Sequence, residues 1–566
     1  MLSPRAFLAC ALSSVGVLLA LLSLSASPQS DADQRLVQPL PSSGENVTES
    51  TRASASLRRP TGFSPNTIAI NDGATLSDIV CPSASDCWAV GYFHAASGGD
   101  RTLIEHWDGG SWSIVPSPNR SNYSELFSVT CNSASDCWAV GPQKMMVHWN
   151  GISWSLVESP ADYTSAVYGV TCASSSDCWA VGNFYNSGLG RQQTLVEHWD
   201  GVSWSIVSSP NASNGQCALD SVTCASASDC WSVGSVGSVG GNGALIVHWN
   251  GISWSLVNSP SVGGTLRGVT CASASQCWAV GGSYVSPSLI EKWDGISWTI
   301  ASGAVTDFLE AVRCNSASDC WGVGFTANFD WPLVEHWNGN AWIFFSAPVP
   351  PEFATDTLHG VSCLSPSDCW AVGDRNDSLF KTLIEHWDGV SWSVVTGPPV
   401  FNSVVSRMTH GSAGAFDVDL HRPGNECRRG GIEGNYQLVL NFLNDLTNVR
   451  KCITTAGAVS SSSIGPNPNQ YTVNLTGVPN AQSVTVTLKT AQDTLGNSGN
   501  VSTRMDLLLG DTNGDGHVDA SDIAQTKSSS GQQVTSINFR SDVNADGRIN
   551  ASDIALVKST VGSAFP

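Results

Sequence analysis

Charged side chains are scarce in this chain of 566 residues. Asp, Glu, Lys and Arg make up 13% of the sequence, about half of the ~25% usual in soluble domains. The 26 basic residues face 47 acidic ones, and the formal net charge is −21. Nothing therefore supplies the cations that replace counterions on a phosphate backbone, which excludes nucleic-acid binding. Gly and Trp are abundant instead, with 54 and 22 copies, as is typical of a β-rich extracellular protein.

Long apolar runs are also lacking outside the N-terminus. Phe7 to Leu24 is apolar, follows Arg5 and precedes small residues, so residues 1–27 are predicted to be a secretory signal peptide. An uncleaved membrane anchor is the alternative, because the run is nearly long enough to span a bilayer. Any membrane attachment of the protein is expected through this segment alone. Residues 28–61 are rich in Ser, Pro and Gln without periodicity, which predicts a disordered linker. The protein is expected to be secreted, extracellular or at the cell surface.

Two phrases recur seven times in the following 340 or so residues. The first is Cys-Pro-Ser-Ala-Ser-Asp-Cys-Trp-Ala-Val-Gly from Cys81, and the second is Leu-Ile-Glu-His-Trp-Asp-Gly-Gly-Ser-Trp from Leu103. Successive copies lie 41 to 52 residues apart. In the second copy, turn residues separate four short strands, expected at 127–131, 137–141, 145–149 and 154–157. Four strands per unit and seven units predict a seven-bladed β-propeller over residues 62–400. An open solenoid is the alternative.

The cysteines of the first phrase are predicted to form seven disulfides. Each pair brackets a five-residue turn between adjacent strands, so the two Cα atoms can approach to bonding distance. Zinc is disfavoured because no second Cys or His pair stands at a fixed offset in each unit. The expected pairs are Cys81–Cys87, Cys131–Cys137, Cys172–Cys178, Cys224–Cys230, Cys271–Cys277, Cys314–Cys320 and Cys363–Cys369. Cys427 and Cys452 flank one later segment and are expected to pair, which leaves Cys217 free or paired with another chain.

No catalytic residue can be named from the repeats. A Glu-His dipeptide recurs in several units, for example at Glu105 and His106. A glycosidase needs two carboxylates in different environments, whereas repetition favours a structural role such as hydrogen bonding between units. The non-repeated polar residues are better candidates, and none is singled out by spacing: Asp220, Arg267, Asp307, Glu310, Arg313 and Asp330. The repeat region looks like secreted bacterial seven-bladed propeller proteins of uncharacterised function.

Residues 401–509 lack the repeat phrases. Alternating apolar runs at 415–420, 436–442, 471–475 and 483–488 are separated by Gly-, Asn- and Pro-containing turns. This pattern predicts an immunoglobulin-like β-sandwich.

Two stretches in residues 510–566 have the residue order of a calcium loop. Oxygen-bearing side chains stand at loop positions 1, 3, 5, 9 and 12, Gly stands at position 6, and position 7 supplies a backbone carbonyl. Apolar helical segments follow both loops, and two Ca²⁺ ions are predicted. The expected ligands are Asp511, Asn513, Asp515, His517, Asp519 and Asp522 in the first loop, and Asp542, Asn544, Asp546, Arg548, Asn550 and Asp553 in the second.

Each loop is followed by one helix, and position 12 is Asp rather than Glu. This combination resembles the type I dockerin module, a small α-helical unit that docks secreted proteins, often polysaccharide-degrading ones, onto cohesin partners. The resemblance implies partner contacts through loop positions 10 and 11 and the following helices. Those positions are Ala520, Ser521, Lys527, Ala551, Ser552 and Lys558. Dockerin-like pairs also occur without a known cohesin, so an intramolecular or envelope partner is the alternative.

The sequence thus predicts a mainly β protein: a seven-bladed β-propeller, a β-sandwich and a dockerin-like calcium module. The first functional hypothesis is a binding or scaffold protein that presents a propeller surface to a glycan or protein in polysaccharide utilisation. The second is a polysaccharide-degrading enzyme, a glycoside hydrolase or lyase, with its active site at the propeller mouth.

Overall fold

The described chain is built mostly from strands that come in sets of four. The computed structural model describes residues 73–565 apart from 121–122, 163, 213–214, 239–240, 261–262, 284–285, 306, 327–330, 349–354, 377–379, 422–424 and 432. The predicted signal peptide and linker lie outside these residues. The first set is the antiparallel series β1 (Ala74–Ser83), β2 (Asp86–His94), β3 (Asp100–Trp107) and β4 (Trp112–Ile114).

Six more four-stranded sheets follow with the same antiparallel order. The second and third are β5 (Ser128–Ser133), β6 (Asp136–Val140), β7 (Met146–Trp149) and β8 (Trp154–Leu156), then β9 (Ala166–Ser174), β10 (Asp177–Asn186), β11 (Arg191–Trp199) and β12 (Trp204–Ile206). The fourth and fifth are β13 (Gln216–Ser226), β14 (Asp229–Ser238), β15 (Gly241–Trp249) and β16 (Trp254–Val257), then β17 (Thr265–Ser273), β18 (Gln276–Ser283), β19 (Ser286–Trp293) and β20 (Trp298–Ala301). The sixth and seventh are β21 (Phe308–Ser316), β22 (Asp319–Phe325), β23 (Pro332–Trp337) and β24 (Trp342–Ser346), then β25 (Thr355–Ser365), β26 (Asp368–Asn376), β27 (Phe380–Trp387) and β28 (Trp392–Val394).

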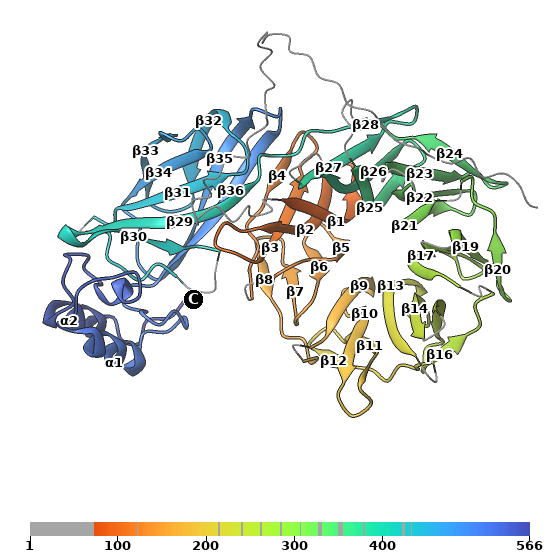
Figure 1. Cartoon of the computed structure of the whole chain (residues 1–566), viewed down its shortest axis with the longest axis horizontal. Helices are drawn as coiled ribbons and strands as arrows, with labels where there is room; N and C mark the ends of the chain where they lie inside the picture. Colours follow the sequence, from red (N-terminus) through yellow and green to blue (C-terminus); the bar gives the residue numbers. More distant parts are fainter. Residues whose placement is uncertain are drawn as a thin grey trace, which may run out of the picture. The chain divides into compact units, whose positions relative to one another are not determined.

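The sheets have a propeller-like arrangement with the first strand of each set innermost (Figure 1). Each innermost strand contacts the innermost strands of the two neighbouring sets, and β1 contacts both β5 and β25. The backbone N–H of Cys81 on β1 donates a hydrogen bond to Ser362 Oγ on β25 at 3.0 Å. The first and last sets are therefore neighbours although no chain connects them directly.

Tryptophan packing is the same at every interface between sets. Trp88 of the first set packs against Trp149 and Trp154 of the second, with ring centroids 4.8 and 5.4 Å apart. Trp370 of the last set packs in the same way against Trp107 and Trp112 of the first, at 5.0 and 5.4 Å. Aromatic pairs at these distances contribute beyond their buried area. The repeated tryptophans thus hold each sheet to the next.

Seven disulfides join the first and second strands of the seven sets. Each links the cysteines predicted from the sequence, with Cα atoms 3.9–4.0 Å apart. The predicted pairing of Cys427 with Cys452 is wrong, because both are free thiols. Cys427 lies against the backbone oxygen of Arg540 at 3.7 Å, whereas Cys452 lies on a strand that pairs elsewhere. Cys217 is also free and buried.

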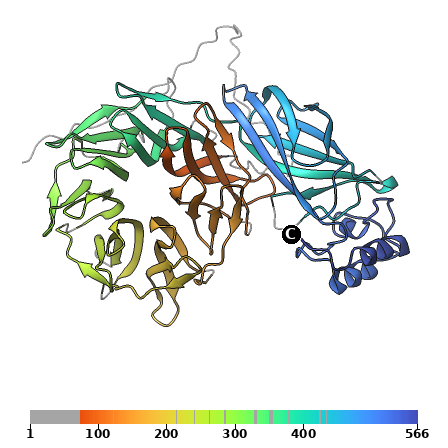
Figure 2. The same cartoon turned by 180° about the vertical axis from the view of Figure 1, so that it is seen from behind.

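Residues 401–509 form two further groups of strands. One sheet has the order β30 (Gly414–Asp419), β29 (Phe401–His410), β31 (Tyr436–Phe442), β34 (Gln470–Thr476) and β33 (Ala458–Ile464). The other group comprises β32 (Leu446–Thr454), β35 (Gln482–Asp493) and β36 (Ser498–Leu507) and continues into the first set, because β36 pairs in parallel with β4. Figure 2 shows this continuation from behind. A single apolar core runs from the first set into both groups.

The C-terminal residues hold two short helices, α1 (Ala520–Ser529) and α2 (Ala551–Ser559). Single turns of 3₁₀ helix lie at Gly411–Ala413 and Phe539–Ser541. A small core of Leu508, Val518, Val543 and Val557 packs this region. None of the helices in the described part of the chain is long and apolar enough to cross a membrane.

Candidate calcium loops and central cavity

The predicted ligands of the first loop also start helix α1. Asp519, at loop position 9, is the N-cap residue and accepts a hydrogen bond from the backbone N–H of Ser521. Asp522, at position 12, is the third helical residue and accepts from the backbone N–H of Asp519 at 2.9 Å. Such a capping box satisfies donors that a helix start leaves unpaired. Asn550 and Asp553 cap α2 in the same way, so both loops are folded by their own ligand residues.

Position 1 of the first loop is a buried carboxylate surrounded by backbone donors. Asp511 is fully buried and accepts from the backbone N–H groups of Gly514 at 2.7 Å and Gly516 at 2.8 Å. Gly516 has φ +85°, as the predicted turn at position 6 requires. Burial raises the pKa of Asp511, and the nearby carboxylates of Asp522 and Asp515 raise it further. Mutually repelling carboxylates of this kind fit a cation.

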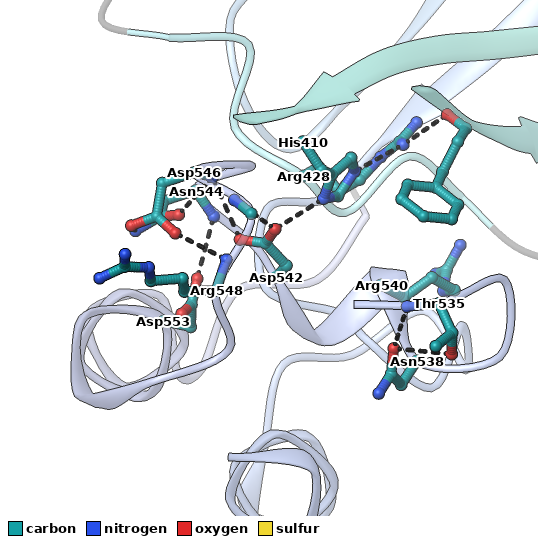
Figure 3. Close-up of polar contacts among 12 residues, drawn as sticks. His410, Arg428, Thr535, Asn538, Arg540, Asp542, Asn544, Asp546, Arg548 and Asp553 are labelled. Carbon is teal, nitrogen blue, oxygen red and sulfur yellow. Dashed lines mark hydrogen bonds and ion pairs between the residues drawn. The ribbon is translucent and has the colours of Figure 1, made fainter. Parts of the chain in front are cut away.

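The second loop repeats this geometry. Asp542 accepts from the backbone N–H of Gly547 at 2.9 Å, and Asp553 accepts from that of Asn550 at 2.9 Å. Burial raises the pKa of Asp553, and the carboxylates of Asp542 and Asp546 raise it further. Figure 3 shows Asp542 and Asp546 on the second loop and Asp553 at the start of α2.

The second loop has a contact that sequence reasoning missed. His410, at the end of β29, forms a buried pair with Asp542, with Nδ1 2.8 Å from Oδ2 (Figure 3). On the other side of the imidazole ring, Arg428 Nη1 lies 3.1 Å from His410 Nε2. Arg428 Nη2 donates a hydrogen bond to Glu426 Oε2 at 2.7 Å. Burial raises the pKa of Glu426, but Arg428 more than offsets this and holds that pKa below its usual value. The predicted position-1 ligand Asp542 is thus oriented from the neighbouring β-region, an arrangement that is common around metal ligands.

Arg540, just before the second loop in the chain, ties the first loop to the same β-region. Its guanidinium donates to the backbone oxygens of Asp511 at 2.9 Å, Thr512 at 3.0 Å and Asn425 at 2.8 Å. Near the second loop, Gly411 approaches so closely that an added Cβ would lie 2.2 Å from the Asp546 backbone oxygen. The two loops of the C-terminal region and residues 401–509 are therefore in close contact.

The carboxylates alone do not form a metal cluster. Within the described residues, no three His, Cys, Asp or Glu side chains come together as a group that could hold a metal ion. A calcium site here would need the Asn oxygens and the backbone carbonyls of His517 and Arg548 as well, which suits an ion that takes six to eight oxygens. The donor set of both loops fits calcium by its chemistry, since every candidate side-chain ligand offers oxygen.

The six residues predicted to contact a partner are all exposed. They lie at the start and in the last turn of the two helices, away from the contacts of His410 and Arg540: Ala520, Ser521, Lys527, Ala551, Ser552 and Lys558. The close contact with the β-region therefore leaves both candidate partner faces free in the described structure.

A second candidate site lies at the centre of the repeated sets. A cavity of about 290 Å³ is lined by one residue from each set, always four positions before the first disulfide cysteine, together with Thr75 and Tyr92. Six of these residues lie on the innermost strand of their set, and Phe127 directly precedes β5. In six sets that residue is the one skipped in the pairing of the first two strands, which makes it the extra residue of a β-bulge. The lining residues at this position are Ser77, Phe127, Tyr168, Asp220, Arg267, Glu310 and His359.

The two sides of the cavity differ in chemistry. Phe127 and Tyr168 stack with ring centroids 5.6 Å apart and an interplanar angle of 17°. Across from them, the Arg267 guanidinium lies 3.6 Å from Asp220. The pKa of Asp220 is raised to about 6, and burial is the largest cause. The positive charge of Arg267 lowers this pKa, and the negative charge of Glu310 raises it. Of the non-repeated candidates, Asp220, Arg267 and Glu310 thus line one cavity, and Arg313 lies deeper in the same channel.

The repeated Glu-His dipeptides have structural roles. In six sets the His Nε2 lies 2.6–2.9 Å from the Asp that precedes the second cysteine of its own sheet. The prediction that this dipeptide bonds between units is thus wrong for its His. The Glu carboxylates are buried, and two reach the segments that connect neighbouring sheets: Glu197 accepts from Ser159 Oγ, and Glu335 accepts from the Val305 backbone. The Glu and His side chains that recur in the repeats therefore have structural roles within the sheets and at the segments between them.

Comparison with known proteins gives a family match for the C-terminal region. Residues 509–562 match the family model described as "Dockerin type I domain". Type I dockerin domains bind calcium and dock onto cohesin partners, and proteins that carry them are typically extracellular or at the cell surface. No curated protein matches the chain.

Solved β-propeller structures are among those similar to this chain. A GH74 xyloglucanase from Xanthomonas campestris is 11% identical, with TM-score 0.42, and the match covers 62% of this chain and 59% of that one. YCF48 from Cyanidioschyzon merolae is 13% identical, with TM-score 0.35 and coverage of 52% and 93%. A fungal lectin, Aleuria aurantia lectin, is 13% identical, with TM-score 0.36 and coverage of 56% and 95%. With TM-scores below 0.5, none of these similarities supports a conclusion about this protein's activity.

Proposed function

We propose that this protein is a secreted binding or scaffold protein that is docked through its C-terminus. A seven-bladed propeller over residues 62–400 presents a ligand surface, an immunoglobulin-like sandwich over residues 401–509 acts as the mount, and residues 510–566 hold two Ca²⁺ ions and dock onto a cohesin-like partner. The cyclic order of the seven sets supports the seven-bladed reading, and the two strand groups with a shared core support the sandwich.

The paired loops carry this proposal. Both loops bury the position-1 carboxylate, both use positions 9 and 12 as a helix cap, and both leave positions 10 and 11 exposed. The dockerin type I match spans both copies. Two equivalent, exposed helix starts offer a partner two similar faces, either of which could engage.

Calcium-dependent docking of the full chain is the direct test. We expect immobilised type I cohesin modules to retain the protein in millimolar calcium and to release it with chelator, because the repelling carboxylates need the ion. The double variant Asp511→Ala/Asp542→Ala should lose retention, whereas Asp445→Asn, at an exposed acid outside the loops, should keep it. Equal retention with and without chelator would reject the calcium part of the proposal; no retention by any cohesin would reject the docking part.

A glycoside hydrolase is the second candidate, and one observation favours it. Asp220, whose pKa is raised to about 6, shares a cavity with the carboxylate of Glu310. Two carboxyl groups in different environments are what acid–base hydrolysis of glycosides needs. Release of new reducing ends from a panel of polysaccharides would support this function if Asp220→Asn and Glu310→Gln each abolish it. A folded, disulfide-intact protein that releases none leaves the binding function.

A further inference from the structure

Each set contributes one side chain, four positions before its first disulfide cysteine, to the lining of the central cavity. A bulge places Ser77, Asp220 and their equivalents outside the regular pairing of the first two strands. The Gly that ends each Cys-Trp-Ala-Val-Gly phrase makes room for the bulge: a Cβ on Gly91 would lie 1.9 Å from the Thr75 backbone oxygen, and one on Gly373 would lie 1.8 Å from that of Thr357. Bulges of this kind re-aim side chains and are common beside binding sites.

The bulged position is where the repeats lose their similarity. In every set the preceding residue is Leu or Val and the second residue after it is Ile or Val, whereas the cavity position itself carries Ser, Phe, Tyr, Asp, Arg, Glu or His. A scaffold role would need the same chemistry in every set, as the His–Asp pairs show. Seven different side chains on one cavity wall instead indicate contact with an asymmetric ligand.

One side of the cavity offers aromatic faces. The stacked Phe127 and Tyr168 line it together with Tyr92, and hydroxyl groups of Thr75 and Ser77 stand nearby. Aromatic rings with a few polar groups are the usual lining of small-molecule sites, and a volume of about 290 Å³ lies at the lower end of their range. A single sugar ring, with one apolar face and hydroxyls at its edge, matches this wall in size and chemistry.

The other side has more negative than positive charge. Arg267 is paired with Asp220, which leaves the carboxylate of Glu310 without a balancing charge among the residues at this position. His359 adds no net positive charge because its Nε2 is bonded to Asp374 Oδ1 at 2.6 Å. Deeper in the channel, burial raises the pKa of Asp78 and the positive charge of Arg313 lowers it. A ligand that balances the site is therefore cationic, and a cation also gains from nearby aromatic faces.

We propose that this cavity binds a carbohydrate that carries a protonated amine, with its ring against Phe127 and Tyr168 and its ammonium group at Glu310. A glucosamine unit has this chemistry. The assignment rests on the proposed binding function and specifies its ligand class. Glu310 selects for the amine, while the aromatic pair contributes affinity for sugar rings in general.

Titration calorimetry on the full chain in calcium tests the assignment. The probes are a glucosamine tetrasaccharide, its fully N-acetylated counterpart, a galacturonate tetrasaccharide and a lysine tetrapeptide. We expect the glucosamine oligosaccharide to bind at least about tenfold more tightly than the other three, because only it offers both the ring and the charge.

Three variants connect the binding to the named residues. Glu310→Gln should weaken glucosamine binding about tenfold and bring it close to that of the acetylated sugar. Phe127→Ala should weaken binding of both sugars. Glu158→Gln is the matched control, since it makes the same change in the repeat region at a side chain that is 80% exposed and outside the cavity. Near-ultraviolet circular dichroism verifies that each variant is folded.

Each other outcome overturns the assignment in a distinct way. Equal affinity for the acetylated sugar, or an unchanged preference in Glu310→Gln, would overturn the amine part. Tighter binding of galacturonate would reverse the charge argument, and equal binding of the lysine peptide would remove the sugar part. No binding of any probe by a protein that still docks to cohesin would reject the cavity as a carbohydrate site and leave the docking function standing.

Discussion

The repeat region and the C-terminal module use internal repetition in opposite ways. In the repeat region all seven copies keep the tryptophans and six keep the His–Asp pair, whereas the copies differ at the position that lines the cavity. In the C-terminal module the two copies keep the candidate ligands and differ in what surrounds them, since His410 reaches only the second loop. Repetition therefore identifies structure in one region and chemistry in the other.

The largest effect is expected from a substitution at the β-bulge that directs the variable side chains of the repeats into the cavity. Gly373→Ala should destabilise the repeat region by about 3 kcal/mol, because the new Cβ would lie 1.8 Å from a backbone oxygen and overpacking on this scale is costly. Chemical denaturation measures it. Gly263→Ala, at a glycine with open space around its Cβ, is the control, and equal stability of the two variants would mean that the bulge can relax.

Buried scaffold carboxylates should make the stability of the repeat region fall as pH rises from about 4.5 to about 8. Burial raises the pKa of Glu105 and of Glu385 to about 8, above the ordinary 4.5. Their contribution to stability is complete below about pH 4.5 and is lost as pH rises through 8, by about 1.4 kcal/mol per pH unit for each group. We expect the melting temperature to fall between pH 6 and 9, and Glu105→Gln to make that fall shallower. A profile that is flat over this range would contradict the buried, neutral state of these carboxyls.

The two calcium loops should respond differently to loss of the β-region contact. His410→Ala removes the side chain that orients Asp542, and such outer partners typically change metal affinity about 10- to 100-fold. We expect calcium titration to show one weakened site and one unchanged site. Arg407→Ala is the control, because Arg407 lies on the same strand and pairs with Asp417 at an exposed position. Equal weakening of both sites would show that the loops act as one unit.

The smallest effect concerns the one set without a His–Asp pair. There Gln276 replaces the Asp, and Lys292 replaces the His and lies 5.1 Å from the Trp278 ring centroid. Gln276→Asp combined with Lys292→His should show a favourable coupling of about 0.5–1 kcal/mol in a double-mutant cycle. A coupling energy near zero would mean that the His–Asp interaction does not stabilise the sheet.

Local rules in the sequence predicted the parts of the fold that depend on neighbours in the chain. The expected strands of the second unit agree with β5 to β8 within two residues, and the seven short disulfides are present. The capping of α1 by Asp519 and Asp522 follows from the same spacing that predicts calcium ligands.

Contacts between distant segments could not be read in this way. His410 and Asp542 are 132 residues apart, and nothing near either residue signals the other. Cys427 and Cys452 seemed paired by proximity in sequence, but Cys427 packs against Arg540 instead. The cavity did leave a signal: the position four residues before each first cysteine varies in chemistry, while the residue before it is always Leu or Val and the second residue after it is always Ile or Val. Its meaning depends on the bulge, which alternation of apolar residues does not reveal.

The parallel pairing of β36 with β4 has a mechanical consequence. Within the described part of the chain, non-covalent contacts join the first and seventh sets across their seam, among them the packing of Trp370 against Trp107 and Trp112. A pull on a docked C-terminus reaches the seventh set through the chain that leaves β28, and it reaches the first set through β36 and the hydrogen bond from Asn500 to Ser113. Tension thus enters on both sides of the seam and does not peel one side from the other. The strand that joins the two regions therefore adds a second connection to the first set beside the contacts across this seam.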